Sequence, residues 1–131
     1  MATQPRRVIT PKEAVEFRAI GGLIKRLIHP QTTGSVNLQL SICYLHPGEE
    51  VYRHRHPNEE AYFVLAGTGV MYLEGHPEIP LAPYVAVYVP PNLEHGQKNT
   101  GDVPLVIVTA LSPPLTTLPE ITDPRARPAG A

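Results

Sequence analysis

Two histidines separated by one residue, His54 and His56, have the types and spacing best suited to chemistry in this chain. They lie in a strand-like run, where successive side chains point to opposite faces. Both imidazoles therefore project from the same face, about 7 Å apart along the backbone. At that spacing both rings can reach one metal ion. Taken alone, the pair leaves open the alternative of two surface histidines on a polar strand.

An acidic residue and a third histidine can complete a metal site. The turn at Pro57 and Asn58 brings Glu60 back beside the two imidazoles, and His95 sits at the end of another strand region. Three neutral imidazoles and a carboxylate suit Zn, Fe, Mn or Ni better than Mg or Ca, which prefer oxygen ligands. Four protein ligands fill a tetrahedral ion but leave two positions open on an octahedral one, for substrate or dioxygen.

Short strands are predicted to position these residues. Residues 36–45 alternate between apolar and polar side chains with a period of two. Further strands are predicted at 51–56, 60–66, 70–73, 84–89 and 103–111, and a tight turn at 67–69 joins two of them as a hairpin. The 16 prolines in 131 residues also argue against long helices. This spacing of short strands predicts an all-β sandwich or closed barrel.

The two ends of the chain are predicted to lie outside the barrel. Thr10, Pro11 and Glu13 form a capping pattern that favours a short helix, which the glycines at 21 and 22 would end. The tail has few large apolar residues and is expected to be packed down or disordered. We therefore expect an N-terminal extension over residues 1–22, a barrel over 23–114 and a Pro-rich tail over 115–131.

Two motifs resemble those of the cupin superfamily, and together they place the resemblance over residues 23–114. The first motif is matched at every defined position by Gly48-x5-His54-x-His56-x3-Glu60-x6-Gly67. The second is similar to Pro90-x-Asn92-x2-His95-x3-Asn99. Tyr84 and Asn92 stand where that pattern has glycine. Asn tolerates the left-handed conformation better than most residues, so we expect the turn to survive and the Tyr84 change to affect a loop only.

This resemblance implies a cupin-like double-stranded β-helix, or jelly-roll barrel, extended by a short N-terminal helix or strand. It implies that His54, His56, Glu60 and His95 bind one divalent metal ion, and that Glu59 faces outward. It also implies a metalloenzyme acting on a small oxygenated organic molecule, with dioxygenase chemistry first and decarboxylase, isomerase or lyase chemistry next. Two alternatives stay open: a non-catalytic ligand-binding cupin, and a metal site that only stabilises the barrel.

The predicted catalytic residues are Glu60, Tyr52 and Tyr62. Tyr52 shares the predicted face of the histidine pair and Tyr62 that of Glu60, so both phenols are expected to face the cavity and to orient substrate or donate a proton. They could instead only pack there. Gln39 is a weaker cavity candidate. Asn99 is expected either to bond near the metal-bearing strand or to shape the turn that follows it.

The remaining histidines and the single cysteine are predicted to lie outside the metal site. His46 precedes a Pro-Gly turn that breaks its register with the pair, whereas His29 and His76 lie beside prolines in loops and are predicted to be solvated. Cys43 is predicted to be a small core residue. With one cysteine no internal disulfide can form, which fits a reducing, cytoplasmic setting.

Composition excludes several partner classes. The 11 basic and 12 acidic residues give a net charge of -1 with no basic stripe, which argues against nucleic acid. No apolar run reaches the roughly 20 residues that a membrane helix needs, and no apolar run follows the N-terminal arginines as in a secretory signal. A homodimer is expected, because isolated jelly rolls often bury a sheet face or exchange an N-terminal strand, and residues 8–28 are apolar enough to do so.

Overall fold

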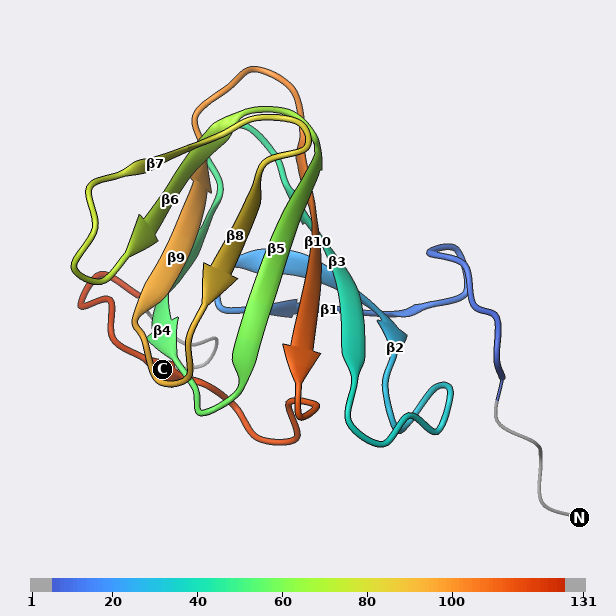
Figure 1. Cartoon of the computed structure of the whole chain (residues 1–131). Helices are drawn as coiled ribbons and strands as arrows, with labels where there is room; N and C mark the ends of the chain where they lie inside the picture. Colours follow the sequence, from blue (N-terminus) through green and yellow to red (C-terminus); the bar gives the residue numbers. More distant parts are fainter. Residues whose placement is uncertain (1–5, 127–131) are drawn as a thin grey trace, which may run out of the picture.

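The computed structural model describes residues 6–126, which form two antiparallel β-sheets and no helix (Figure 1). The strands in chain order are β1 (Val15–Ala19), β2 (Gly22–Ile28), β3 (Gln39–Leu45), β4 (Glu50–Arg55), β5 (Glu59–Ala66), β6 (Gly69–Leu73), β7 (Ile79–Leu81), β8 (Ala86–Val89), β9 (His95–Asn99), β10 (Leu105–Ser112) and β11 (Glu120–Ile121). One sheet has the order β1-β2-β3-β10-β5-β8 and the other β11-β4-β9-β6-β7. The all-β prediction is confirmed, and no helix in the described residues is long and apolar enough to cross a membrane.

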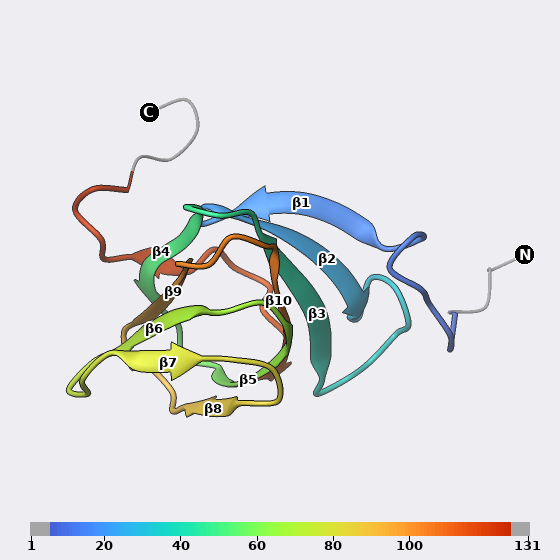
Figure 2. The same ribbon diagram turned by 90° about the horizontal axis from the view of Figure 1, so that it is seen from above.

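The two sheets face each other around a shared apolar core (Figure 2). Strand β10 shows why its sequence folds this way. Leu105, Ile107, Thr109 and Leu111 are buried, while the residues that alternate with them are partly exposed. This period of two is the pattern of a strand with one face on the core. The other sheet supplies Met71 and Leu73 from β6. All six strands predicted from the sequence are present, although residues 36–38 lie outside β3.

The short helix predicted from Thr10 onward does not form. The backbone makes a single turn, in which Glu13 N donates to Thr10 O at 3.0 Å and Thr10 Oγ1 donates to Glu13 Oε1 at 2.9 Å. The predicted capping contact is therefore real, but the chain continues as β1, which pairs with β2 along its whole length. Val15 and Phe17 are better suited to a strand than to a helix. Within the predicted extension, Val15–Ala19 is thus a strand.

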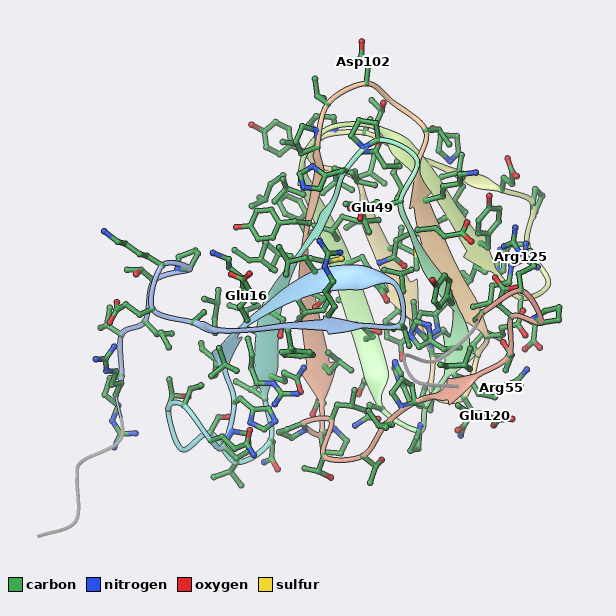
Figure 3. All side chains as sticks on the ribbon, turned by 180° about the vertical axis from the view of Figure 1, so that it is seen from behind. Glu16, Glu49, Arg55, Asp102, Glu120 and Arg125 are labelled. Atoms are coloured by element: carbon green, nitrogen blue, oxygen red, sulfur yellow. The ribbon has the colours of Figure 1, made fainter. Side chains whose placement is uncertain are left out.

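The described part of the tail packs across one end of the two sheets (red in Figure 1). Its short strand β11 pairs with β4, and Thr122 N and Asp123 N both donate to Arg53 O, at 2.8 and 3.1 Å. Glu120 is the partner of Arg55 in this pairing, and the two side chains lie at the same end of the molecule (Figure 3). The division of the chain at residues 22 and 114 stays a prediction.

Candidate metal centre

The pairing of β4 with β9 brings two of the histidines face to face. His54 and His95 are directly paired, with ring centroids 4.2 Å apart. The register of this pairing shifts between Val51 and His54, as a β-bulge does. His95 was predicted at the end of a strand region, but it is the first residue of β9. The turn before it survives as expected, because Asn92 adopts a left-handed φ of 63°.

The four predicted ligands converge. One nitrogen or oxygen of each of His54, His56, Glu60 and His95 lies within 4.8 Å of all the others. All four side chains are buried, with exposed fractions between 1% and 6%. Glu60 arrives from β5 in the first sheet, whereas His54 and His95 come from β4 and β9 in the second. The site therefore joins the two sheets.

Each imidazole is held by a hydrogen bond to a backbone carbonyl near it in sequence. Nδ1 of His54 lies 2.7 Å from Tyr52 O, Nδ1 of His56 lies 3.0 Å from Asn58 O, and Nδ1 of His95 lies 2.8 Å from Leu93 O. A carbonyl oxygen can only accept, so Nδ1 carries the proton in each ring and Nε2 keeps its lone pair. Such bonds are typical of histidines that bind metal through Nε2.

The Nε2 atoms face a carboxylate oxygen. Glu60 Oε1 lies 3.1 Å from Nε2 of His56 and 3.2 Å from Nε2 of His95. Lone pairs that face an anionic oxygen need a cation between them, either a metal ion or a proton on a ring nitrogen. This donor set therefore fits a divalent metal that accepts imidazole and carboxylate ligands.

The pKa values of the cluster reflect two opposing effects, burial and the interaction between the imidazoles and Glu60. Burial, reinforced by His95, lowers the pKa of His54 to about 4, so this ring is neutral and ready to bind metal at neutral pH. Burial also lowers the pKa of His56, but the hydrogen bond and charge of Glu60 outweigh it and the net pKa is raised. Burial raises the pKa of Glu60, yet its bonds to His56 and His95 bring it down to about 2. Glu60 is thus a carboxylate.

The cluster opens into a cavity of about 350 Å³ between the sheets. His54, His56 and Glu60 line it, whereas His95 is not among its lining residues. Tyr62 also lines it, as predicted, and its hydroxyl donates to Glu60 Oε1 at 3.0 Å. Burial, together with the charge of Glu60, raises the pKa of Tyr62 well above its usual value, so the phenol keeps its proton.

Tyr52 does not face this cavity, which corrects the prediction made for it. Its neighbour Val51 lines the cavity instead, and the ring of Tyr52 lies against the position of Gly21. The reason is the bulge: an extra residue between Val51 and His54 changes which side chains share the inner face. A catalytic role for Tyr52 thereby loses its geometric basis.

The other residues singled out in the sequence lie in the cavity wall, in a turn, on the surface or in the core. Gln39 lines the cavity, where its Oε1 accepts a hydrogen bond from Leu115 N at 2.8 Å. Asn99 shapes the turn after β9, because Gly101 N donates to its Oδ1 at 2.8 Å. Glu59 is exposed, as expected. Cys43 is buried, and burial raises its pKa to about 12, so it is a thiol and no nucleophile.

Several polar cavity residues escaped the sequence-based prediction, among them His29, Arg26 and Gln97. His29 was expected in solvent, but it is 3% exposed and lines the cavity beside Arg26. Its surroundings include Leu115 O, 3.4 Å from Nε2 and distant in sequence, which no local pattern could reveal. Gln97 is two residues after His95 on β9, so the alternation of the strand could have placed it on the inner face. Its Oε1 is buried with no hydrogen-bond partner in the described structure.

Comparison with known proteins decides the family. Residues 41–111, more than half of the chain, match the model of the cupin domain family. The chain belongs to this family. The predicted jelly-roll, or double-stranded β-helix, is therefore confirmed for this cupin, in agreement with its structural neighbours.

Relatives of this cupin carry varied names. Protein SchB of Streptomyces halstedii is 31% identical over 114 residues, which cover 86% of this chain and 82% of that protein. The tetracenomycin polyketide synthase protein TcmJ of Streptomyces glaucescens is 33% identical over 116 residues, covering 85% and 76%. The crystal structure of the DMSP lyase DddQ of Ruegeria pomeroyi superposes with a TM-score of 0.76 at 26% identity, covering 87% of this chain and 64% of that one.

Proposed function

We propose that this cupin is a metal-dependent enzyme that converts a small oxygenated organic molecule inside its barrel. The observation that carries the proposal is that the metal cluster faces a cavity: His54, His56 and Glu60 line a space large enough for a small organic molecule. A purely structural metal site would be closed on all sides. Relatives named for polyketide synthesis and for DMSP cleavage support a small organic substrate.

The proposed ligands are His54, His56, Glu60 and His95, and Fe, Mn, Zn and Ni all suit them. A bound ion of this kind would supply a Lewis acid for a carbonyl or enediol, or a binding site for dioxygen. We therefore propose oxygen-dependent cleavage as the first reaction to test, and decarboxylation, isomerisation and lyase chemistry as the next. One metal site of this type is compatible with all of them.

The protein's own groups would handle the proton. Tyr62 stays a neutral phenol and donates to Glu60 Oε1, so it can donate to an oxygen of a substrate in the same cavity. Glu60 is a carboxylate at neutral pH and can accept a proton. Apolar side chains such as Ile24, Val51 and Leu111 line the same cavity, so a substrate that filled it would displace water and strengthen the electrostatic interactions of these groups. We propose Glu60 and Tyr62 as the catalytic residues.

The test is to purify the full chain from cultures supplemented with iron, manganese, nickel or zinc, and to measure the metal content of each preparation. Each preparation is then assayed with diketones, phenols and sugar acids, with dioxygen uptake followed in parallel. We expect about one metal ion per chain and turnover with at least one metal. His54→Ala should lose both, whereas His46→Ala, an exposed histidine outside the cluster, should keep both.

Two results would contradict the proposal. Turnover that is absent with every metal, together with thermal stabilisation by a substrate, would favour a non-catalytic ligand-binding cupin. A metal ion that stabilises the fold, in a protein that binds none of the small molecules tested, would favour a structural site. In both cases the metal content of His54→Ala still reports whether the four ligands hold an ion.

We also propose a homodimer in the cytoplasm. Strand β1 lies at the edge of its sheet and pairs with β2 alone, so one row of its backbone groups can pair with a second copy. The buried thiol Cys43 is compatible with a reducing compartment. Sedimentation equilibrium at micromolar concentration tests the dimer, and a monomer would contradict it. Cell fractionation tests the location.

A further inference from the structure

A row of polar side chains crosses the cavity wall formed by the first sheet. Strand pairing sets Arg26 opposite Ser41, Ser41 opposite Thr109, and Thr109 opposite Tyr62. All four residues line the cavity. Directly paired residues in antiparallel strands point to the same face. The row therefore runs from the metal cluster, where Tyr62 contacts Glu60, to Arg26 on β2, three strand spacings or about 14 Å away.

Arg26 ends this row without a negatively charged partner. Among the described residues that line the cavity, Arg26 is the only arginine or lysine and Glu60 the only carboxylate, at opposite ends of the row. The described structure gives Arg26 no ion pair. Its contacts are a hydrogen bond from Nη1 to Gln31 Oε1 at 3.1 Å and a stacking contact on Phe17, with 4.9 Å between the guanidinium carbon and the ring centre.

One atom of this guanidinium is buried and unsatisfied. Nε of Arg26 is shielded from solvent and has no hydrogen-bond partner in the described structure. A buried donor without a partner costs free energy, so a partner that reached Nε would stabilise the site. Nε is covered in this conformation, so the side chain must shift slightly before a ligand can bond it. Because Nη1 is already engaged, the edge formed by Nε and Nη2 is the one that such a shift would open. This edge fits the two oxygens of a carboxylate in paired hydrogen bonds.

We propose that Arg26 is the anion subsite of this cavity and that the ligand is an organic acid. Its carboxylate binds the Nε edge of Arg26, and its apolar body packs on Phe17 and Ile24. Under the proposed function, on which this part rests, the oxygen-bearing end reaches the metal cluster. A singly charged carboxylate suits the site better than phosphate, because a single guanidinium faces the ligand among apolar side chains and His29 is not an additional cation. The pKa of His29 is lowered by burial.

The experiment uses the metal-free, 15N-labelled full chain, so that its result is independent of the metal. Benzoate and benzamide serve as matched probes, because they share a shape and differ in charge. Each is titrated to 20 mM at constant ionic strength, about 0.15 M, where weak nonspecific attraction is screened. The readout is the side-chain Nε–Hε signal of Arg26, assigned by its loss in Arg26→Lys. A separate titration with Zn²⁺ follows the imidazole signals and reports on the metal cluster alone.

We expect benzoate to shift the Arg26 signal and to bind at least about 5-fold more tightly than benzamide, a modest share of what a charged hydrogen bond contributes. Arg26→Gln should bring the two affinities together. Arg26→Lys keeps the positive charge but loses the paired donors of the guanidinium, so its preference for benzoate over benzamide should be intermediate. This variant replaces Arg26→Gln in the test if Arg26→Gln folds poorly. Arg18→Gln, which removes an exposed arginine of β1 outside the cavity, should keep the wild-type preference.

Three results would overturn the proposal: no benzoate-induced shift of Arg26, equal affinity for both probes in the wild type, or an unchanged preference in Arg26→Gln. Failure of Zn²⁺ to perturb the imidazole signals would instead count against the proposed function. It would leave the carboxylate preference of Arg26 standing. The two proposals therefore fail separately.

Discussion

The two ends of the cavity are built differently. At the metal end, each imidazole is fixed by a hydrogen bond of 2.7 to 3.0 Å to a carbonyl two residues away. At the other end, Arg26 and His29 are held by contacts of 3.1 to 3.4 Å, and one buried donor has no partner. The imidazoles of the metal end are thus organised by local backbone before anything binds. Arg26 keeps one unpaired donor, which the carboxylate proposed above would satisfy.

Removal of one metal ligand is expected to have the largest effect, and it should act on the metal end alone. His54→Ala should lower metal affinity by at least about 100-fold, because loss of a ligand exceeds the 10- to 100-fold effect of losing a supporting bond. Isothermal titration with Zn²⁺ measures it. The benzoate preference at Arg26 should not change. If it falls as well, the two ends are not independent and the comparison fails.

Acid should weaken the metal end next. The pKa of His54 is about 4 in the folded chain and about 6.5 when unfolded, so between these values the unfolded chain binds the extra proton and stability falls as pH falls. From pH 7 to pH 5 we expect this ring to cost the metal-free protein about 2 kcal/mol. The raised pKa of His56 acts in the opposite direction, since its contribution is present at low pH and lost as pH rises.

His54→Gln isolates this contribution from that of His56. Urea unfolding of both proteins at pH 7 and pH 5 gives the comparison, and the variant should lose about 2 kcal/mol less than the wild type over that interval. Equal losses would show that His54 does not titrate as its burial requires.

Tyr62→Phe tests a residue that touches the metal cluster without belonging to it. The change removes the hydroxyl that donates to Glu60 Oε1 and should lower metal affinity about 10-fold, as loss of a supporting hydrogen bond does. Any turnover should fall further, because the proposed proton donor is gone. Zn²⁺ titration and steady-state kinetics measure the two effects. An unchanged kcat in the presence of saturating metal would limit Tyr62 to a packing role.

The smallest expected effect concerns Gln97, which lies two residues after His95 on β9. Gln97→Leu removes a buried amide oxygen that has no partner, so the metal-free variant should be more stable by about 1 kcal/mol. Thermal unfolding measures this gain. Gln97→Glu is the contrasting variant, because it buries a charge there and should destabilise the fold. A loss of stability in Gln97→Leu would mean that the amide oxygen of Gln97 is satisfied in the folded chain.

The sequence predicted the metal end better than the arginine end for a physical reason. The spacing of His54, His56 and Glu60 is local, and strand alternation with one turn is enough to bring them together. Arg26 and His29 join the cavity only because β2 pairs with β3 and the tail returns over them. His29 and its partner Leu115 are 86 residues apart in the chain, so only the folded structure reveals the contact.

The error at Tyr52 has a similar origin. Simple alternation placed it beside the histidines, but a bulge depends on how β4 fits its neighbour rather than on the residues of β4 alone. The predicted helix failed for the same kind of reason, since pairing with β2 outweighed a valid capping pattern at Thr10. In each case a local rule was overridden by a contact between distant strands.

The bulge in β4 has a consequence for how this sequence can change over time. It is matched across the ladder by Gly96, where a Cβ would come within 2.8 Å of Val51 O. Deleting one of the two residues between Val51 and His54 would remove the bulge and still leave both side chains on the inner face, because regular alternation sets residues two apart on the same side. Adding or deleting one residue between His54 and His56 would instead set the two imidazoles on opposite faces. The spacing of the two histidines is therefore constrained, whereas the bulge before them can be lost without turning them out of the barrel.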